Sequence, residues 1–299
     1  MHEIDQLVVH FNREGAFVLN VSLGIIMFSV ALGLTIDDFK RILASPKSIF
    51  IALISQFLLL PFLTFVLVFI AKPTPSIALG MFMVAACPGG NVSNFMSMIA
   101  RANVALSVSI TAVASVLAIA LTPLNFAFWP GLYEPTSSFL QNIDISIIEM
   151  VQTVFIIMGI PLVLGMWMRQ NYLKLTLKIE KALRIASLLI FGAIILGALA
   201  LNFEAFWNNL YYVLAIVLIH NFVALTTGYT VGYSFGLTLP DKKSLSIETG
   251  IQNSGLGLLL IFTFFNGLGG MALVAAWWGI WHLISGLSLA YWWKYQSER

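Results

Sequence analysis

The side chains with the most chemical potential lie in two short polar stretches, each inside a long apolar segment. The first, ACPGGNVSNF at residues 86–95, interrupts an apolar run with Pro-Gly-Gly and follows it with amide and hydroxyl side chains. The second, IETGIQNSGLG at residues 247–257, places the carboxylate Glu248 among amides, hydroxyls and glycines. Small hard cations prefer oxygen ligands of these kinds, whereas clusters of His or Cys favour transition metals. The two stretches therefore indicate a cation site built from oxygen atoms.

One carboxylate among neutral oxygens suits a monovalent cation such as sodium, because the pair leaves no net buried charge. The candidate ligands are Gln56, Ser93, Asn94, Ser107, Thr111, Glu248, Gln252, Asn253 and Ser254. Backbone carbonyls freed where helices unwind would add to them. The alternative is that Glu248, five residues beyond Lys243, forms a salt bridge or reaches the membrane surface, and that the neutral residues merely bond neighbouring helices.

The same interruptions also suit an anion. A half-helix that begins near Asn91 presents free backbone N–H groups and the positive end of its dipole. Cation sites beside an anion site are what a coupled symporter needs. A proton-coupled carrier or an efflux antiporter, with Glu248 as the proton site, is the alternative. No nucleophile with a base and no metal triad is found at membrane depth, so we expect no enzyme.

The segments that must position these residues are membrane helices. Of 299 residues, 60% are hydrophobic and only 9% are charged. The uncharged runs are continuous over about 20 residues or more, as membrane helices require, whereas barrel strands are about ten residues long. We therefore predict an all-α integral membrane protein with nine transmembrane helices. The predicted spans are 16–36, 47–70, 76–99, 104–128, 143–168, 184–203, 210–235, 244–265 and 270–293.

The distribution of Lys and Arg sets the orientation. With nine spans, 13 of the 15 basic residues fall on one side, and only Arg13 and Lys72 fall on the other. Because cytoplasmic ends collect Lys and Arg, we expect an outside N-terminus and a cytoplasmic C-terminus in the cell's inner (plasma) membrane. The expected divisions are an external tail at 1–15, a first half at 16–168, a basic cytoplasmic connector at 169–183, a second half at 184–293 and a cytoplasmic tail at 294–299.

The two halves share a faint repeat. Three spans beginning at 47, 76 and 104 correspond to three beginning at 210, 244 and 270, and the middle span of each trio is interrupted. The breaks fall at residues 88–90 in span 76–99 and at Gly250, Gly255 and Gly257 in span 244–265, and the two spans enter from opposite sides. Paired interrupted helices in inverted halves indicate a transport site near the bilayer midplane. Alternatively, the glycines only permit close helix packing.

Five motifs in this order resemble the bile acid:sodium symporter family. They are CPGGNVSN (87–94), NVALSVSIT (103–111), SIETGIQNSGLG (246–257), WHLISG (281–286) and, more weakly, GIIMFSVALGLTIDDF (24–39). The resemblance implies a core domain, made of the two trios, that rocks against a panel domain made of the other spans. Many members differ by carrying an additional N-terminal helix, which belongs to the panel domain. Many also carry Thr in place of Asn91 and Asn in place of Leu283, at two positions that face the substrate cavity in the family.

The resemblance also implies which residues bind. The first sodium site would consist of Ser93, Asn94, Ser107, Thr111 and Glu248. The second would consist of Gln56, Glu248, Gln252 and the backbone of Thr249 and Ile251. The substrate would contact Asn91, Asn253 and His282.

The implied activity is import of an organic anion, either bile-acid-like or a small organic acid, by alternating access with two sodium ions. We expect the anion, sodium and the lipid bilayer as partners, no nucleic acid, and no cofactor besides sodium as the coupling ion. For His282, and for the pair His220 and Asn221, ordinary hydrogen bonding between helices is the alternative.

Overall fold

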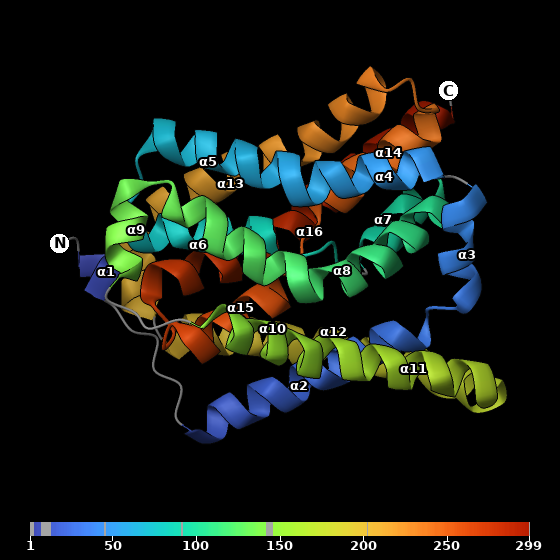
Figure 1. The fold of residues 1–299 in the computed structure, drawn as a ribbon, viewed down its shortest axis with the longest axis horizontal. Coiled ribbons are helices and arrows are strands. Elements are labelled where there is room, and N and C mark those ends of the chain that lie inside the picture. Colours follow the sequence, from blue (N-terminus) through green and yellow to red (C-terminus); the bar gives the residue numbers. More distant parts are fainter. Residues whose placement is uncertain are drawn as a thin grey trace.

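A computed structural model describes residues 3–6, 13–44, 46–90, 92–141, 146–201 and 203–298. These residues form helices joined by short turns and contain no β-strand, only an isolated bridge between Gly89 and Gln252 (Figure 1). The predicted all-α class is confirmed for this part of the chain. The helices are α1 (Glu3–Gln6), α2 (Arg13–Leu32), α3 (Ile36–Ala44), α4 (Pro46–Ile54), the π-helical turn η1 (Ser55–Leu59), α5 (Leu60–Ala71), α6 (Pro75–Ala86), α7 (Val92–Ile99), α8 (Val104–Gly131), α9 (Glu134–Leu140), α10 (Ile147–Val154), the π-helical turn η2 (Phe155–Gly159), α11 (Ile160–Asn171), α12 (Leu173–Leu201), α13 (Phe203–Ser234), α14 (Leu239–Gly250), α15 (Ser254–Phe264) and α16 (Gly269–Ser297).

Five helical stretches within the described ranges are long and apolar enough to cross a bilayer. They are Pro46–Ala71, Val104–Gly131, Ile147–Asn171, Val213–Ser234 and Gly269–Ser297. Three shorter apolar stretches, Val21–Leu32, Pro75–Ala86 and Ser254–Phe264, belong to other predicted spans. The count of nine spans stays a prediction, because two of these three stretches are halves of interrupted helices.

The predicted boundaries differ most from the observed ones at the connector between the two halves. The connector at 169–183 is helical except for Tyr172, since α11 ends at Asn171 and α12 begins at Leu173. Its Leu, Lys, Glu and Ala residues are strong helix formers, so the basic segment continues directly into the next span. The span predicted from 143 begins among residues 142–145, which lie outside the described ranges.

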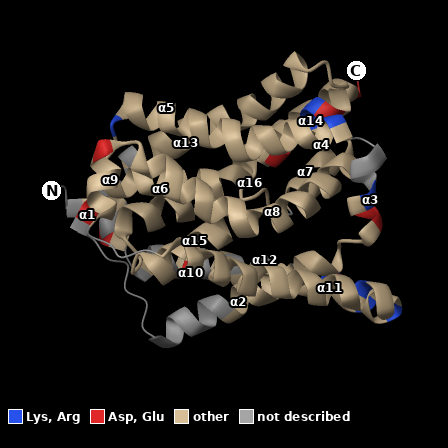
Figure 2. Ribbon diagram, in the orientation of Figure 1, with Lys and Arg blue, Asp and Glu red and all other residues tan. Residues whose placement is uncertain are grey.

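The helices pack in two groups. One group contains α2, which packs against both α11 and α12, along the lower side of Figure 1. In the other group α13 packs against α14, and α6 packs against α8 and α16. The positions of Lys and Arg along the ribbon are concentrated at α3, at α14 and at the end of α11 (Figure 2).

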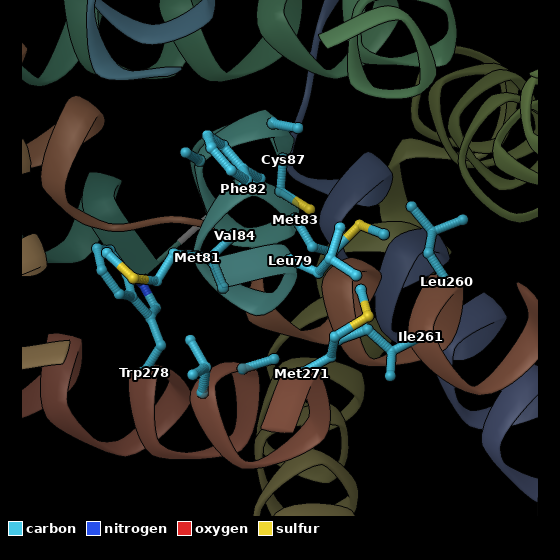
Figure 3. Close-up of a cluster of buried hydrophobic side chains, with 14 of the residues drawn as sticks. Leu79, Met81, Phe82, Met83, Val84, Cys87, Leu260, Ile261, Met271 and Trp278 are labelled. Carbon is cyan, nitrogen blue, oxygen red and sulfur yellow. The ribbon is translucent and has the colours of Figure 1, made fainter. Parts of the chain in front are cut away.

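The core of the second group is α6. Every residue from Ser76 to Ala86 is buried, as expected of a helix that is apolar all round. Its Met and Leu side chains interlock with Leu260 and Ile261 of α15 and with Met271 and Trp278 of α16 (Figure 3). The short helix α1 packs at the start of α6, where Asp5 Oδ1 accepts a hydrogen bond of 2.9 Å from Ser76 N. This rigid centre holds the first interrupted helix in place.

Candidate ion and substrate site

Both predicted helix interruptions are present. The first separates α6 from α7, where Pro88 removes a backbone donor and Cys87 takes an extended conformation. The second separates α14 from α15 at residues 251–253, and the Asn253 side chain caps α15 by accepting from Leu256 N at 3.1 Å. The prediction was wrong about Gly255 and Gly257, which lie inside α15. Gly255 and Gly257 do not interrupt the helix, because Asn253, which precedes both, already caps the start of α15.

The two breaks are hydrogen-bonded to each other through the backbone. Gly90 N donates to Ile251 O at 2.7 Å, and Asn253 N donates to Pro88 O at 2.8 Å. Both bonds use peptide groups that the interrupted helices leave without internal partners. The half-helices α6, α7, α14 and α15 therefore meet at one point.

Glu248 lies beside this crossing, on the last turns of α14, with 1% of its surface exposed. Ser93 Oγ donates to Glu248 Oε1 at 2.6 Å, and Ser107 Oγ lies 2.5 Å from the same oxygen. Thr111 Oγ1 lies 3.1 Å from both carboxylate oxygens. Lys243 is turned elsewhere and donates to Ala100 O at 3.1 Å and Ser297 Oγ at 3.2 Å. Glu248 thus neither reaches the surface nor pairs with Lys243.

With Glu248 ionised, this cluster contains more acceptor oxygens than hydroxyl protons. Ser107 Oγ lies 2.9 Å from Asn94 Oδ1 as well as close to Glu248 Oε1, yet its hydroxyl has one proton. Thr111 Oγ1 likewise faces Asn94 Oδ1 at 3.3 Å, both Glu248 oxygens and Ser107 O at 3.1 Å. Oxygens that converge without enough donors form an environment in which a cation is favourable.

A second group of polar atoms lies against Gly89. A Cβ added at Gly89 would stand 2.8 Å from Glu248 Oε2 and 3.2 Å from Gln56 Nε2, so both side chains lie directly against this glycine. Both amide atoms of Gln56, and Oε1 of Gln252, are buried and have no hydrogen-bond partner within the described part of the chain. Buried polar atoms normally have partners, so these atoms indicate a ligand or water.

Backbone carbonyls border the second group. Thr249 O accepts from Gln252 Nε2 at 2.7 Å, and Ile251 O accepts from Gly90 N. Gln56 is placed by the π-helical turn η1, in which Leu60 N donates to Ser55 O, five residues back. Pro61 follows this turn and supplies no backbone donor.

A cavity of about 720 Å³ reaches the crossing from one side. Its polar lining near the breaks includes Asn94, Asn253, Ser254 and His282, and much of the remaining wall is apolar. His282 is 4% exposed, and its Nδ1 has no partner in the described ranges. The third predicted substrate residue, Asn91, lies outside the described residues.

Asn221 makes the hydrogen bonds between helices that were the alternative to a binding role, whereas Ser97 and Ser55 were not predicted at the site. Asn221 Nδ2 donates to Gly250 O at 2.8 Å, and Asn221 Oδ1 accepts from Ser285 Oγ at 2.6 Å. Asn221 therefore supports the last carbonyl of α14, next to the break. Ser97 Oγ joins Ser107 Oγ at 3.1 Å, and Ser55 Oγ joins Thr249 Oγ1 at 3.0 Å. The sequence marks these residues only as polar side chains in apolar spans, and this does not identify their hydrogen-bond partners.

Apolar helices interrupted around buried polar groups are the architecture of secondary membrane transporters. The profile of the Sodium Bile acid symporter family matches residues 20–209. The chain belongs to this family of sodium-dependent transporters and is a multi-pass membrane protein.

Three relatives illustrate the range of the family. The "Uncharacterized sodium-dependent transporter YocS" of Bacillus subtilis is 32% identical over 281 residues, which cover 94% of this chain and 84% of the relative. The "Probable sodium/metabolite cotransporter BASS1, chloroplastic" of Arabidopsis thaliana is 29% identical over 82% of this chain, and the chain spans only 59% of that relative. The human "Sodium-dependent organic anion transporter" is 25% identical over 87% of this chain and 68% of its own length.

Proposed function

We propose that this protein is a sodium-coupled symporter that imports an organic anion by alternating access, with two sodium ions for each anion. The observation that carries the proposal is the Glu248 cluster, where a buried carboxyl group of α14 and hydroxyl oxygens of α7 and α8 converge within hydrogen-bond distance. The names of the relatives, one of which is a sodium-dependent organic anion transporter, support both the ion and the class of cargo.

The first sodium ion would bind Ser93, Asn94, Ser107, Thr111 and Glu248. The second would bind Gln56, Glu248, Gln252 and the carbonyls of Thr249 and Ile251. Glu248 would serve both sites, since its Oε1 faces the hydroxyl cluster and its Oε2 lies against Gly89 with Gln56. Gln56 and Gln252 support the second site through their partnerless amide atoms.

The anion would bind in the cavity, close to the crossing. Asn253 and His282 lie in the cavity wall, and Asn91 precedes the first residue of α7. The N-terminus of α7 presents backbone N–H groups and a positive dipole end, which favour a negative charge. Sodium ions would then shape the cavity by holding together the half-helices that border it.

Transport would arise from movement between two domains. The core would contain the two trios of spans around α6. The panel would contain the spans of α2, α10–α11 and α12, in which α11 and α12 both pack on α2. In this proposal nine spans place the N-terminus outside and the C-terminus in the cytoplasm of the cell's inner membrane. The halves 16–168 and 184–293 would be inverted repeats joined by the connector at 169–183.

The coupling would make uptake electrogenic. Two sodium ions with a monovalent anion carry one net positive charge inward, so a potential of ~100 mV contributes about 2.3 kcal/mol per cycle. This energy adds to that of the sodium gradient, which acts on each ion.

The test is a stability and uptake experiment on the purified, reconstituted protein. A panel of organic anions is screened for thermal stabilisation in sodium chloride and in choline chloride, and the stabilising anions are then assayed for uptake into proteoliposomes. We expect stabilisation and uptake only in sodium, and faster uptake when the inside is negative. Uptake that follows a pH gradient in sodium-free buffer would instead establish the proton-coupled alternative.

A further inference from the structure

The cavity is also lined by charged side chains that do not belong to the ion cluster. Among the described residues that line it, Glu180 and Lys181 are the ones with carboxylate or ammonium groups, and both belong to α12. Ile185, one turn further along α12, also lines the cavity. The third and fourth turns of α12 therefore contribute Glu180, Lys181 and Ile185 to the wall of a largely apolar cavity, and this section of the wall is called the rim.

Glu180 is already neutralised. Its Oε2 accepts from Arg169 Nη1 at 2.9 Å, and the two side chains retain only 18% and 22% of their exposure. Arg169 lies in the last turn of α11, so the pair also fixes the corner between α11 and α12. Partial burial strengthens this ion pair relative to one at an open surface.

Lys181 is different, because it has no ion-pair or hydrogen-bond partner within the part of the chain that the structure describes. Its ammonium adds a positive charge to a cavity whose neighbouring carboxylate is already paired. A charge beside low-dielectric walls acts over a longer distance than one in bulk water. Among the described residues, Lys181, Glu180 and Arg169 together therefore carry one net positive charge at this part of the cavity.

We propose that Lys181 attracts the negative charge of the cargo from the cavity rim, in addition to the N-terminus of α7 near the crossing, and that Arg169 prevents Glu180 from repelling it. This inference rests on the proposed function, since it assumes that the cargo is an organic anion. A single unpaired cation selects a monoanion over an uncharged analogue, while the apolar wall, with Leu23, Met27 and Val30, contacts the rest of the molecule.

The charge of the rim can be measured without knowing the cargo. Met98 lines the cavity and is 56% exposed, so Met98→Cys introduces a reporter thiol, whereas Cys87, the only native cysteine, is buried. The rates of modification by an anionic methanethiosulfonate (ethylsulfonate) and a cationic one (ethyltrimethylammonium) give a ratio that reports the local potential. The protein without Met98→Cys supplies the background.

Two substitutions on the same helix form a matched pair in this assay. We expect Lys181→Gln to lower the anion-to-cation rate ratio about threefold to tenfold. Lys178→Gln removes the same charge from a position that is exposed, as Lys181 is, but does not line the cavity, and should change the ratio less than about twofold. Equal effects of the two substitutions overturn the role of Lys181.

The Arg169–Glu180 pair provides a rescue experiment. Arg169→Gln leaves the Glu180 carboxylate unneutralised and should lower the ratio, and adding Glu180→Gln should restore it. A ratio that does not respond to Arg169→Gln overturns the screening role.

Binding then connects the potential to recognition. Cholate and its uncharged methyl ester serve as probes, both measured at saturating sodium. We expect Lys181→Gln to weaken cholate binding about fivefold, to leave the ester unaffected and to leave sodium affinity unchanged. If the wild-type protein shows no sodium-dependent binding of any organic anion, the proposed function is wrong, whereas a cholate affinity equally insensitive to both lysine substitutions rejects only the role of Lys181.

Discussion

Ser93 donates a hydrogen bond of 2.6 Å to Glu248, although the two residues lie 155 positions apart in the chain. The bond joins α7 to α14, and each of these is one half of a different interrupted helix. Any ion that replaces or supplements this bond therefore acts on both helices at once. The following predictions test this arrangement.

Replacing Glu248 by Ala should abolish sodium-dependent binding, because the carboxylate that both proposed sites share is lost. A ligand present at 100 times its Kd stabilises a folded protein by about 2.7 kcal/mol, so sodium should raise the Tm of the wild type by several degrees. The variant should show no such rise. Glu298→Ala is the control, because it removes a surface carboxylate that pairs with Arg101. This variant should show the same sodium-dependent rise in Tm as the wild type. An unaltered sodium response in Glu248→Ala rejects the shared site.

Thr111→Val should weaken sodium binding more than anion binding, because it removes a hydroxyl that faces Glu248 and Asn94. We expect the sodium Kd to rise about tenfold, which equals 1.4 kcal/mol. Anion affinity at saturating sodium should change little. Thr122→Val is the control, since Thr122 is buried in the same helix and its hydroxyl has no partner in the described ranges. The reverse order of effects would remove Thr111 from the first site.

Gln56→Leu should remove the second sodium ion and leave the first. The Hill coefficient for sodium in anion binding should then fall from about 2 to about 1, because only one ion remains coupled to the anion. Equilibrium binding of a radiolabelled anion at increasing sodium concentrations measures this. A coefficient that stays at the wild-type value contradicts the assignment of Gln56.

Gly89→Ala should damage both sodium sites through a steric effect. The new methyl group would stand 2.8 Å from Glu248 Oε2 and 3.1 Å from Glu248 O, so side chain and backbone must move. We expect sodium affinity to fall at least about tenfold. Gly131→Ala, at a glycine with nothing within 4 Å of the added Cβ, should leave sodium titrations unchanged. Normal sodium affinity in Gly89→Ala means that the cluster does not depend on this approach.

Asn221→Leu should destabilise the protein and weaken sodium binding, because Gly250 O loses its side-chain donor beside the break. An unsatisfied buried carbonyl costs about 1 to 3 kcal/mol. Ser285→Ala keeps that donor and should have a smaller effect. Ser288→Ala, whose hydroxyl bonds only to Ile284 of its own helix, is the control. Thermal unfolding with and without sodium separates the two effects, and a sodium affinity unaffected by Asn221→Leu restricts this residue to packing.

The helical class and the positions of both breaks were predictable from sequence, because composition and Pro-Gly patterns act locally. Pro88 lacks a donor wherever it stands, and a polar residue in an apolar run needs a partner. The exact extent of the second break was not predictable. Gly250 borders it, while Gly257 is helical, since Asn253 caps the next half-helix at an earlier position.

The partners of the polar residues depend on tertiary packing and were less accessible. The sequence singled out Ser107 and Thr111 by their helical spacing, but it gave no sign that Asn221 reaches Gly250 or that Ser55 reaches Thr249. The π-helical turn η1 was not predicted either, because one additional residue in a turn does not change the pattern of an apolar segment. Such features follow from how distant helices meet.

The two backbone bonds between Pro88–Gly90 and Ile251–Asn253 have a bearing on how such a protein can diversify. Peptide groups are supplied by every amino acid, with proline lacking only the donor, so the two bonds do not depend on the chemistry of the side chains at their donor and acceptor residues. Gly89 is the exception in this stretch, because an added Cβ there would meet Glu248. Side chains of the cavity wall can therefore change during evolution without loss of the two bonds that join the interrupted helices.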